Sequence, residues 1–238
     1  MKKLYVKEID STNYYLKSHY DILDHMTWLS TDYQLKGKGT KDRLWFGNED
    51  SLMCSLLLKE DIKKDTVHLI PLLSAQVLHK VLSKYSDHIL IKWPNDLLMQ
   101  HKKLSGILVE SVILSHEVLA LVIGFGINVN QQVFQDDLKD VATSLSLSTS
   151  KTYHKEVIYD ALIDQFEKDY LAFKKDYKLT IDYCNKYHVL NGKKIYYSDH
   201  HELKIAKVIK IQDDGTLLVI GDQQEIALSN KDISIVKV

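Results

Sequence analysis

Two long apolar segments, KLSGILVESVI at residues 103–113 and EVLALVIGFGIN at residues 117–128, constrain the fold of this chain most. A short turn around residues 115–116 separates them, so we expect them to form two long strands. Gly124 and Gly126 alternate in the second segment. Two glycines two residues apart leave one face of a strand bare, which makes room for a flat ligand, for a bulge or for a tightly packed helix.

The remaining segments before residue 190 alternate between predicted strands and amphipathic helices. Strands are expected at residues 4–9, 26–34, 51–59 and 88–94, and helices after Asp10 or Ser11, from residues 66–70 to 85, over 153–177 and over 180–187. The first helix is expected to turn Tyr14, Tyr15 and Leu16 inward, with Asp10 or Ser11 as its cap. Several consecutive strands mixed with helices predict an α+β fold with a mixed or mainly antiparallel sheet.

The C-terminal segment has a different character. Five short strand-like segments, KKIYYSD, ELKIAKVIKI, GTLLVIG, QEIALS and DISIVKV, are separated by turn residues. This pattern is typical of a small β-barrel. We therefore predict two domains, residues 1–189 and 190–238.

Charge and composition exclude several classes of function. The net charge is −1, from 31 basic and 32 acidic side chains, so no overall field attracts DNA or a membrane. No signal peptide and no run of 18 apolar residues is found, which predicts a cytoplasmic protein. The barrel segment also lacks the basic and aromatic stripe of single-strand binders. Cys54 and Cys184 lie too far apart to suggest a metal-binding pair.

The stretch KGKGTKDRLW, residues 36–45, gathers four basic side chains around two glycines. Glycine backbone can approach a phosphate closely, and nearby cations neutralise its charge. The spacing matches neither a Walker P-loop nor a dinucleotide fingerprint. Taken alone, the stretch fits a solvated surface loop as well as an anion site.

Two further stretches combine polar residues with backbone constraints. KWPND, residues 92–96, ends a buried strand. It is either an ordinary turn or a turn that points polar groups into the space beyond the end of the strand. In KKLSGIL, residues 102–108, Lys103 begins a strand and Gly106 interrupts its apolar pattern. Each stretch by itself also has a purely structural explanation.

The chain resembles the biotin protein ligases over about residues 8–130. The resemblance rests on five segments in this order: DSTN, the basic glycine loop ending in Trp45, KWPND, KLSGILVE and IGFGINVN. The resemblance implies a class II synthetase-like catalytic domain followed by an SH3-like β-barrel. Because no helix-turn-helix precedes DSTN, the chain is similar to the single-function form that does not bind DNA.

The resemblance also implies a reaction. Biotin and MgATP would give biotinyl-5′-adenylate, whose biotinyl group then passes to a lysine of a biotin carboxyl carrier protein. It assigns catalysis to Lys38, Lys103 and Asp96, with Mg²⁺ carried by ATP and no metal ligands of the protein's own. It assigns biotin binding to Ser11, Thr12, Asn13, Gln34, Gly37, Lys38, Lys103 and Gly106, and ATP or adenylate binding to Gly39, Thr40, Lys41, Arg43, Trp45, Asn95, Gly126 and Asn128.

The basic loop departs from the family pattern, which usually reads Gly-Arg-Gly-Arg-Arg-Gly-Arg. Lys38 replaces the first arginine. It keeps the positive charge but cannot make the planar, two-pronged contact of a guanidinium group. Thr40 replaces the second arginine and carries no charge, and Asp42 replaces a glycine. We hypothesise that the chain holds its adenylate less firmly, or that Lys41 and Arg43 compensate.

The sequence leaves open two other functions and the possibility of a homodimer. A lipoate or octanoate attachment enzyme would share the catalytic fold, although the signatures of those enzymes lack KWPND as it stands here. A non-catalytic binding protein would explain Thr40 and Asp42. It would not explain the joint presence of Gln34, Lys103, Gly106 and Asn128. The strands over 103–128 could pair edge to edge in a homodimer, as in some family members.

Overall fold

The computed structural model describes residues 1–40, 43–199, 202–229 and 233–237, and its first part is built on a seven-stranded sheet. The strands are β1 (Lys2–Ile9), β2 (Thr27–Gln34), β3 (Ser51–Leu58), β4 (Ile89–Lys92), β5 (Asp96–Met99), β6 (Lys102–Leu114) and β7 (Glu117–Asn128), in the order β1-β2-β3-β7-β6-β5-β4. Only β1 and β2 are parallel among these neighbours. The predicted α+β fold with a mixed sheet is confirmed.

Strand β5 was missed in the sequence analysis. The strand of KWPND was expected to end at Pro94, and β4 does end just before it. However, the chain turns at once and returns antiparallel, with Lys92 opposite Asp96. Pro94 and Asn95 therefore form the turn of a short hairpin, and Asp96 lies at the start of a strand.

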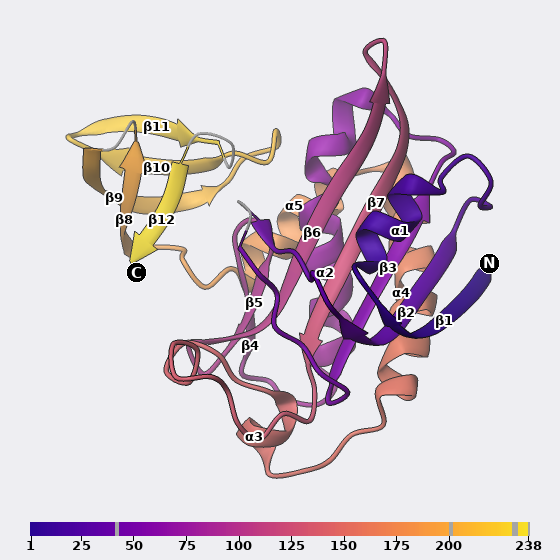
Figure 1. The fold of residues 1–238 in the computed structure, drawn as a ribbon. Coiled ribbons are helices and arrows are strands. Elements are labelled where there is room, and N and C mark those ends of the chain that lie inside the picture. The colour runs from indigo at the N-terminus through magenta and orange to yellow at the C-terminus, as the bar shows by residue number, and fades with distance from the viewer. Residues whose placement is uncertain (41–42, 200–201, 230–232, 238) are drawn as a thin grey trace.

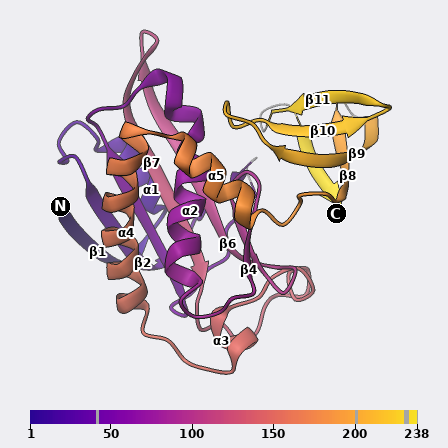
Figure 2. The ribbon, with the colours of Figure 1, turned by 180° about the vertical axis from the view of Figure 1, so that it is seen from behind.

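Helices cover both faces of this sheet. Helix α1 (Thr12–Ser18) packs on β3 and β7 on one face (Figure 1). Helices α2 (Ile70–Leu82), α4 (Lys155–Lys175) and α5 (Lys178–Tyr187) lie across the opposite face (Figure 2). A 3₁₀ turn (Lys64–Leu69) precedes α2, and the short α3 (Leu145–Thr149), which the sequence analysis did not foresee, follows β7. No helix in the described ranges is both long and apolar enough to cross a membrane.

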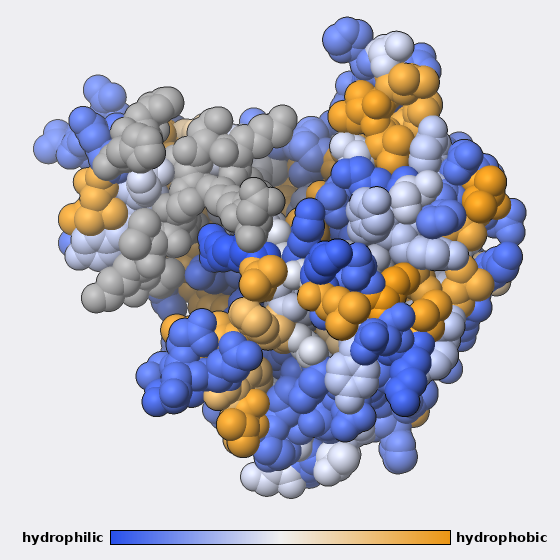
Figure 3. All heavy atoms as spheres, viewed as in Figure 1, coloured by the Kyte–Doolittle hydropathy of each residue, from blue (hydrophilic) through white to orange (hydrophobic). Residues whose placement is uncertain are grey.

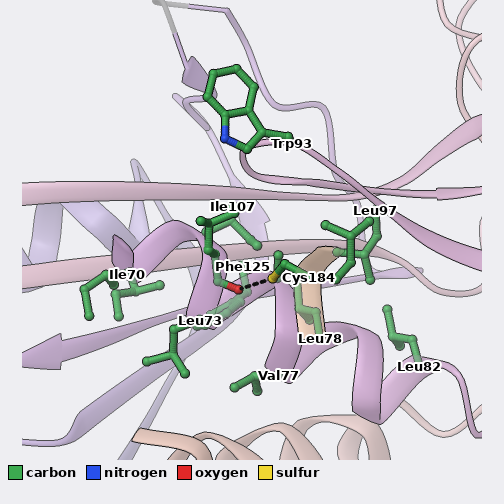
Figure 4. Close-up of a cluster of buried hydrophobic side chains, with 14 of the residues drawn as sticks. Ile70, Leu73, Val77, Leu78, Leu82, Trp93, Leu97, Ile107, Phe125 and Cys184 are labelled. Atoms are coloured by element: carbon green, nitrogen blue, oxygen red, sulfur yellow. Dashed lines mark hydrogen bonds between the residues drawn. The ribbon is translucent and has the colours of Figure 1, made fainter. Parts of the chain in front are cut away.

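The main hydrophobic core lies between the sheet and α2, α4 and α5. Leu73, Val77 and Leu78 of α2 belong to the same buried cluster as Ile107 and Phe125 of the central strands (Figure 4). The strand predicted at 51–59 is present as β3, and all eight of its residues are buried. Burial of this kind contributes about 1.5–3 kcal/mol to the free energy of unfolding for each large apolar side chain.

A second, smaller core lies under α1 on the other face. Ser11 caps the helix by accepting a hydrogen bond from the Tyr14 N–H. Leu16 is fully buried, whereas the Tyr14 side chain is 64% exposed. The expectation that Tyr14 points inward is therefore wrong, because a seven-residue helix can turn only one side towards the sheet.

A five-stranded antiparallel sheet follows. Its strands are β8 (Lys194–Asp199), β9 (Glu202–Ile211), β10 (Leu217–Gly221), β11 (Gln224–Leu228) and β12 (Ile233–Lys237), in the order β11-β10-β9-β8-β12. The five expected strands are thus present, and they curl into a separate unit in Figure 1. We propose the domain division at residues 189 and 190 because the second sheet begins shortly after it.

The junction between the two sheets is held by hydrogen bonds to the β4–β5 hairpin. The Val189 N–H donates to the Ile91 carbonyl at 2.8 Å, which adds the chain to the edge of β4. The Trp93 indole N–H donates to the Gly215 carbonyl, in the loop before β10, at 2.9 Å. The turn of KWPND therefore contacts both units.

His188 is buried at this junction as a neutral imidazole. Its Nε2 accepts a hydrogen bond from the backbone N–H of Trp93 at 3.1 Å, so its proton is on Nδ1, which lies 3.0 Å from the Asn191 side-chain oxygen. Burial lowers the pKa of His188 to about 4, although the hydrogen bond to Asn191 opposes this shift. The fold therefore favours the unprotonated ring.

We predict that His188 makes stability pH-dependent. Because its folded pKa lies below its unfolded value, its stabilising contribution is complete above about pH 6.5 and is lost as the pH falls towards 4. At pH 5 the loss should be about 2 kcal/mol. Urea unfolding of the wild type and of His188→Gln at pH 7.5, 6, 5 and 4.5 measures it.

The difference between the two proteins isolates His188 from other titrating groups. Glutamine can accept from Trp93 and donate to Asn191 without titrating. As the pH falls, the free energy of unfolding of the wild type should therefore decrease more than that of the variant. A difference that stays constant across this pH range would refute the assignment.

Candidate active site

The candidate site lies on the α1 face of the large sheet. It is formed by the first turn of α1, the end of β2, the loop after β2 and the central parts of β6 and β7. Side chains alternate along a strand, so the even-numbered residues of β7 face this side while Ile123, Phe125 and Ile127 enter the main core. Gly124 and Gly126 are the even-numbered residues at the site.

The basic glycine loop is ordered into a small hairpin over its described residues. The Gly39 N–H donates to the Arg43 carbonyl at 2.7 Å, and the Trp45 N–H donates to the Gly37 carbonyl at 3.0 Å. Lys36 points elsewhere, in an exposed ion pair with Asp10 at 2.8 Å. Lys41, together with Asp42, lies outside the described residues.

The Trp45 indole lies on the glycines of the central strands. A Cβ on Gly126 would be 2.4 Å from the ring, and a Cβ on Gly106, opposite it in the sheet, would be 3.1 Å away. Any side chain at Gly126 would therefore push the indole off the sheet. Of the three explanations considered for these glycines, room for a flat group is the one seen at Gly126, and here that group is the protein's own Trp45.

Lys103 and Asp96 form an ion pair beside this ring. The Lys103 Nζ lies 2.7 Å from a carboxylate oxygen of Asp96 and 5.8 Å from the centre of the Trp45 ring. The Lys103 backbone is fixed by hydrogen bonds to Val141 and Thr143, which follow β7. A fixed backbone with a half-exposed ammonium suits the binding of an anion that arrives from solvent.

The inner end of the site is polar. The Thr12 N–H and hydroxyl lie 2.8 and 3.0 Å from the side-chain oxygen of Gln34. Ser55 of β3 lies behind Thr12, at 2.7 Å between the two hydroxyl oxygens. Ser55 was not predicted, although it is the only polar residue inside the apolar run LMCSLLL and could have been noticed for that reason.

Two adjacent spaces surround these groups. The inner cavity measures about 40 Å³, far less than the roughly 300–1,000 Å³ typical of small-molecule sites. Next to it lies a groove of about 850 Å³, which reaches the junction residues Leu190 and Lys193. Trp45 and Lys103 line both spaces, so movement of the indole would join them.

Two predicted ligand-binding amides are engaged by the protein itself. The Asn95 side chain donates to the Ile107 carbonyl at 2.7 Å. The Asn128 side chain donates to the Thr143 carbonyl at 3.0 Å and accepts from Gln131. Both residues therefore shape the walls, whether or not a ligand also meets them.

The structure brings most of the predicted site residues together. The cavity is lined by Ser11, Thr12, Asn13, Gln34, Lys38, Gly39, Thr40, Trp45, Asn95, Lys103, Gly106 and Gly126, and the groove by Arg43, Asp96 and Asn128. Gly37 lies just outside, in a neighbouring depression that shares Gln34 and Trp45 with the cavity. Their roles in binding stay predictions.

Cys54 reaches the cavity wall from β3, but its chemistry is suppressed. Burial raises the pKa of this thiol far above its ordinary value, so it behaves as a small apolar group. Within the described ranges, no three His, Cys, Asp or Glu side chains cluster closely enough to hold a metal ion.

Solved structures share this fold. The biotin protein ligase from Aquifex aeolicus, in complex with biotin and ATP, superposes with a TM-score of 0.88 at 25% identity and covers 100% of this chain and 99% of its own. A biotin protein ligase-like protein of unknown function from Silicibacter has a TM-score of 0.75 at 8% identity, which shows the fold alone.

Sequence relatives are also similar to this chain. The bifunctional ligase/repressor BirA of Bacillus spizizenii is 32% identical over 208 residues, which are 81% of this chain and 61% of the relative. The chain thus spans about three-fifths of that protein. Biotin–protein ligase 2 of Arabidopsis thaliana is 28% identical over 231 residues, covering 87% and 68%.

One family model matches residues 5–128, which contain every group of the inner cavity and more than half of the chain. This range runs from β1 to the end of β7, so it includes DSTN, the basic loop, KWPND and the glycine-bearing strands. The chain belongs to the biotin/lipoate A/B protein ligase family.

Proposed function

We propose that the protein is a biotin protein ligase. It would join biotin and ATP to form biotinyl-5′-adenylate and pyrophosphate, and then pass the biotinyl group to a lysine of a biotin carboxyl carrier protein. The observation that carries the proposal is the Lys103–Asp96 ion pair at 2.7 Å, which lies where the polar cavity and the groove meet.

Lys103 and Lys38 suit the first step because that step brings two anions together. A carboxylate oxygen attacks the α-phosphorus, and the bond from that phosphorus to pyrophosphate breaks. The carboxylate and the phosphate repel each other unless cations lie between them. Lys38 and Lys103 line the same cavity from opposite elements, the loop and β6. Mg²⁺, carried by the polyphosphate, would neutralise further charge.

Asp96 suits the second step. The amine of the acceptor lysine attacks the acyl carbon, a C–N bond forms, and the C–O bond to AMP breaks. The attacking amine must be neutral and must lose a proton as the amide forms. Asp96 opens onto the groove, so its carboxylate can orient that amine or accept its proton.

The polar end of the cavity favours biotin over lipoate. Ser11, Thr12 and Gln34 offer hydroxyl and amide groups that match the donors and acceptor of a cyclic urea, whereas a dithiolane offers no N–H. The relatives and the Aquifex structure, which contains biotin and ATP, support the same choice. The joint presence of Gln34, Lys103 and Gly106 around the cavity argues against a non-catalytic relative.

The proposal places the protein in the cytoplasm, where ATP and carrier proteins are found. Both cysteines, Cys54 and Cys184, are free and buried, as expected in a reducing compartment.

A homodimer through the outer edge of β6 is part of the proposal. Strand β5 pairs with β6 only up to Gly106, so in the described part of the chain no strand lies beside the outer edge of β6 beyond Ile107. Near its end Ile113 and Leu114 are 60% and 63% exposed, and apolar side chains gather below the hairpin tip in Figure 3. An open edge with exposed apolar groups can pair with a second strand.

Biotin-dependent adenylation tests the proposed function directly. Purified protein should exchange labelled pyrophosphate into ATP only when biotin is present, and biotin should become attached to a carrier domain supplied in the assay. Lipoate and octanoate, tested in parallel, should support no exchange. Exchange with lipoate and not with biotin would replace the proposal by the alternative activity.

Replacing Lys103 should weaken catalysis more than binding of the apolar part of biotin. Lys103→Met keeps the stem and removes the cation between the two anions, so kcat/KM for pyrophosphate exchange should fall about 10²–10³-fold. Lys102→Met is the matched control, because the neighbouring lysine side chain is bonded to the Lys139 carbonyl, away from the cavity. Equal losses in both variants would contradict the role given to Lys103.

Thr40 should govern how long the adenylate stays bound. Thr40 lines both spaces, and an arginine there could donate charge-assisted hydrogen bonds to the phosphate. Thr40→Arg should slow the dissociation of purified biotinyl-adenylate about tenfold or more, measured by rapid filtration. Thr152→Arg, at an exposed position outside both spaces, serves as control. An unchanged dissociation rate would remove the hypothesis.

A further inference from the structure

A cluster of buried polar side chains lies beside the start of β6. Its members come from the start of β3, the end of β7 and the chain that follows β7: Ser51, Asn128, Gln131, Thr143 and Ser144. Their exposed fractions lie between 0% and 5%. Buried polar groups cost free energy unless they are hydrogen-bonded, so the bonds that these side chains make show what the cluster holds in place.

The start of β6 depends on this cluster because β7 does not reach it. Backbone pairing between β6 and β7 begins only at Ser105. The chain after β7 takes the place of β7 beside Lys103. The Lys103 N–H donates to the Val141 carbonyl at 2.7 Å, and the Lys103 carbonyl accepts from the Thr143 N–H at 2.9 Å. The position of Lys103 therefore depends on what holds this short segment.

Asn128 joins the segment to the end of β7. Its Nδ2 lies 3.0 Å from the Thr143 carbonyl and 3.5 Å from the Lys103 carbonyl, and both of these oxygens only accept. The nitrogen of the amide must therefore face them, and its oxygen must face the other way. That oxygen accepts a hydrogen bond from the Gln131 Nε2 at 3.0 Å.

Gln131 fixes the orientation of the Asn128 amide. An oxygen of Gln131 in place of its nitrogen would face the Asn128 oxygen with no proton between them, so only the observed orientation makes the bond. The same nitrogen donates to Ser51 Oγ at 2.5 Å. The Gln131 backbone carbonyl accepts from Ser144 Oγ at 2.6 Å. Gln131 is thus held through both its side chain and its backbone.

The other polar atom of the Gln131 side chain makes no bond. Within the described part of the chain, Gln131 Oε1 is buried and has no hydrogen-bond partner. A buried oxygen without a partner is unfavourable, whereas leucine would fill a similar volume without that cost. The amide therefore contributes through its nitrogen, which acts on Asn128 and Ser51.

We propose that Gln131 is a positioning residue for the adenylation step. By directing the Asn128 amide onto two backbone carbonyls, it keeps the start of β6 in place. The Lys103 ammonium is thereby held where the cavity and the groove meet. The inference rests on the proposed function for the reaction that Lys103 serves, and Gln131 acts on that reaction only through Lys103.

A double-mutant cycle tests whether Gln131 acts through Lys103. Gln131→Leu keeps the approximate volume and removes the donor, so kcat/KM for biotin-dependent pyrophosphate exchange should fall about tenfold. In the Lys103→Met background, which has no ammonium to misplace, the same change should alter kcat/KM less than about twofold. An equal loss in both backgrounds would overturn the inference, because it would indicate a defect that does not pass through Lys103.

Gln76 of α2 supplies a matched control. Like Gln131 it is 5% exposed, and its Oε1 also has no partner among the described residues. It lies in a helix on the opposite face of the sheet. Gln76→Leu should leave kcat/KM within about twofold of wild type. A loss in Gln76→Leu as large as that in Gln131→Leu would contradict the inference.

Amide hydrogen exchange, followed by NMR in the ligand-free protein, tests the structural part of the inference without any substrate. In Gln131→Leu the protection of the Lys103 and Thr143 amides should fall about tenfold or more, while that of Ile123 in the middle of β7 stays unchanged. Gln76→Leu should leave all three amides as protected as in wild type. Unchanged protection at Lys103 and Thr143 in Gln131→Leu, or an equal fall at Ile123, would refute the inference.

Ser51→Ala keeps the test decidable if Gln131→Leu does not fold. It removes one of the two partners of the Gln131 nitrogen and leaves the bond to Asn128, so the loss of kcat/KM and of Lys103 protection should each be about threefold. No effect on either measurement would then overturn the inference. If the wild type shows no biotin-dependent pyrophosphate exchange, the proposed function fails, and the protection of the Lys103 amide still decides whether Gln131 holds the start of β6.

Discussion

The alternation of side chains along β7 is the constraint on which the rest of the site depends. Ile123, Phe125 and Ile127 anchor the strand in the main core, so the residues between them must face α1. Glycine at these positions lets two protein groups approach the sheet, Asn13 at Gly124 and Trp45 at Gly126. A shift of one residue in the register would exchange the core face for the binding face.

Much of the fold could be predicted because its signals are local. The long strands, the helix stripes and the five C-terminal strands each follow from periodicity within one segment, and they were found where expected. Strand β5 was missed because its four residues are too few to show a period, and Tyr14 was misplaced because a short helix offers too few residues to define its inward side.

The site was harder to predict for a different reason. The sequence identified residues that line the cavity, since their motifs stand out along the chain. It did not indicate that Asn128 and Asn95 bond to backbone carbonyls, or that Ser55 and Glu110 complete a hydrogen-bond chain with Asn13. Such contacts join residues up to 97 positions apart, and only the packed structure brings them together.

The hydrogen bond from the Trp93 indole to Gly215 has a mechanical consequence. Trp93 lies three residues before Asp96, in the turn that delivers this carboxylate to Lys103. Since the other end of that bond belongs to the loop before β10, any displacement of the C-terminal unit would pull on the turn. Because the C-terminal unit is bonded to this turn, a molecule that binds the C-terminal sheet could move the Asp96 carboxylate, and so change the proposed acyl transfer, without entering the site.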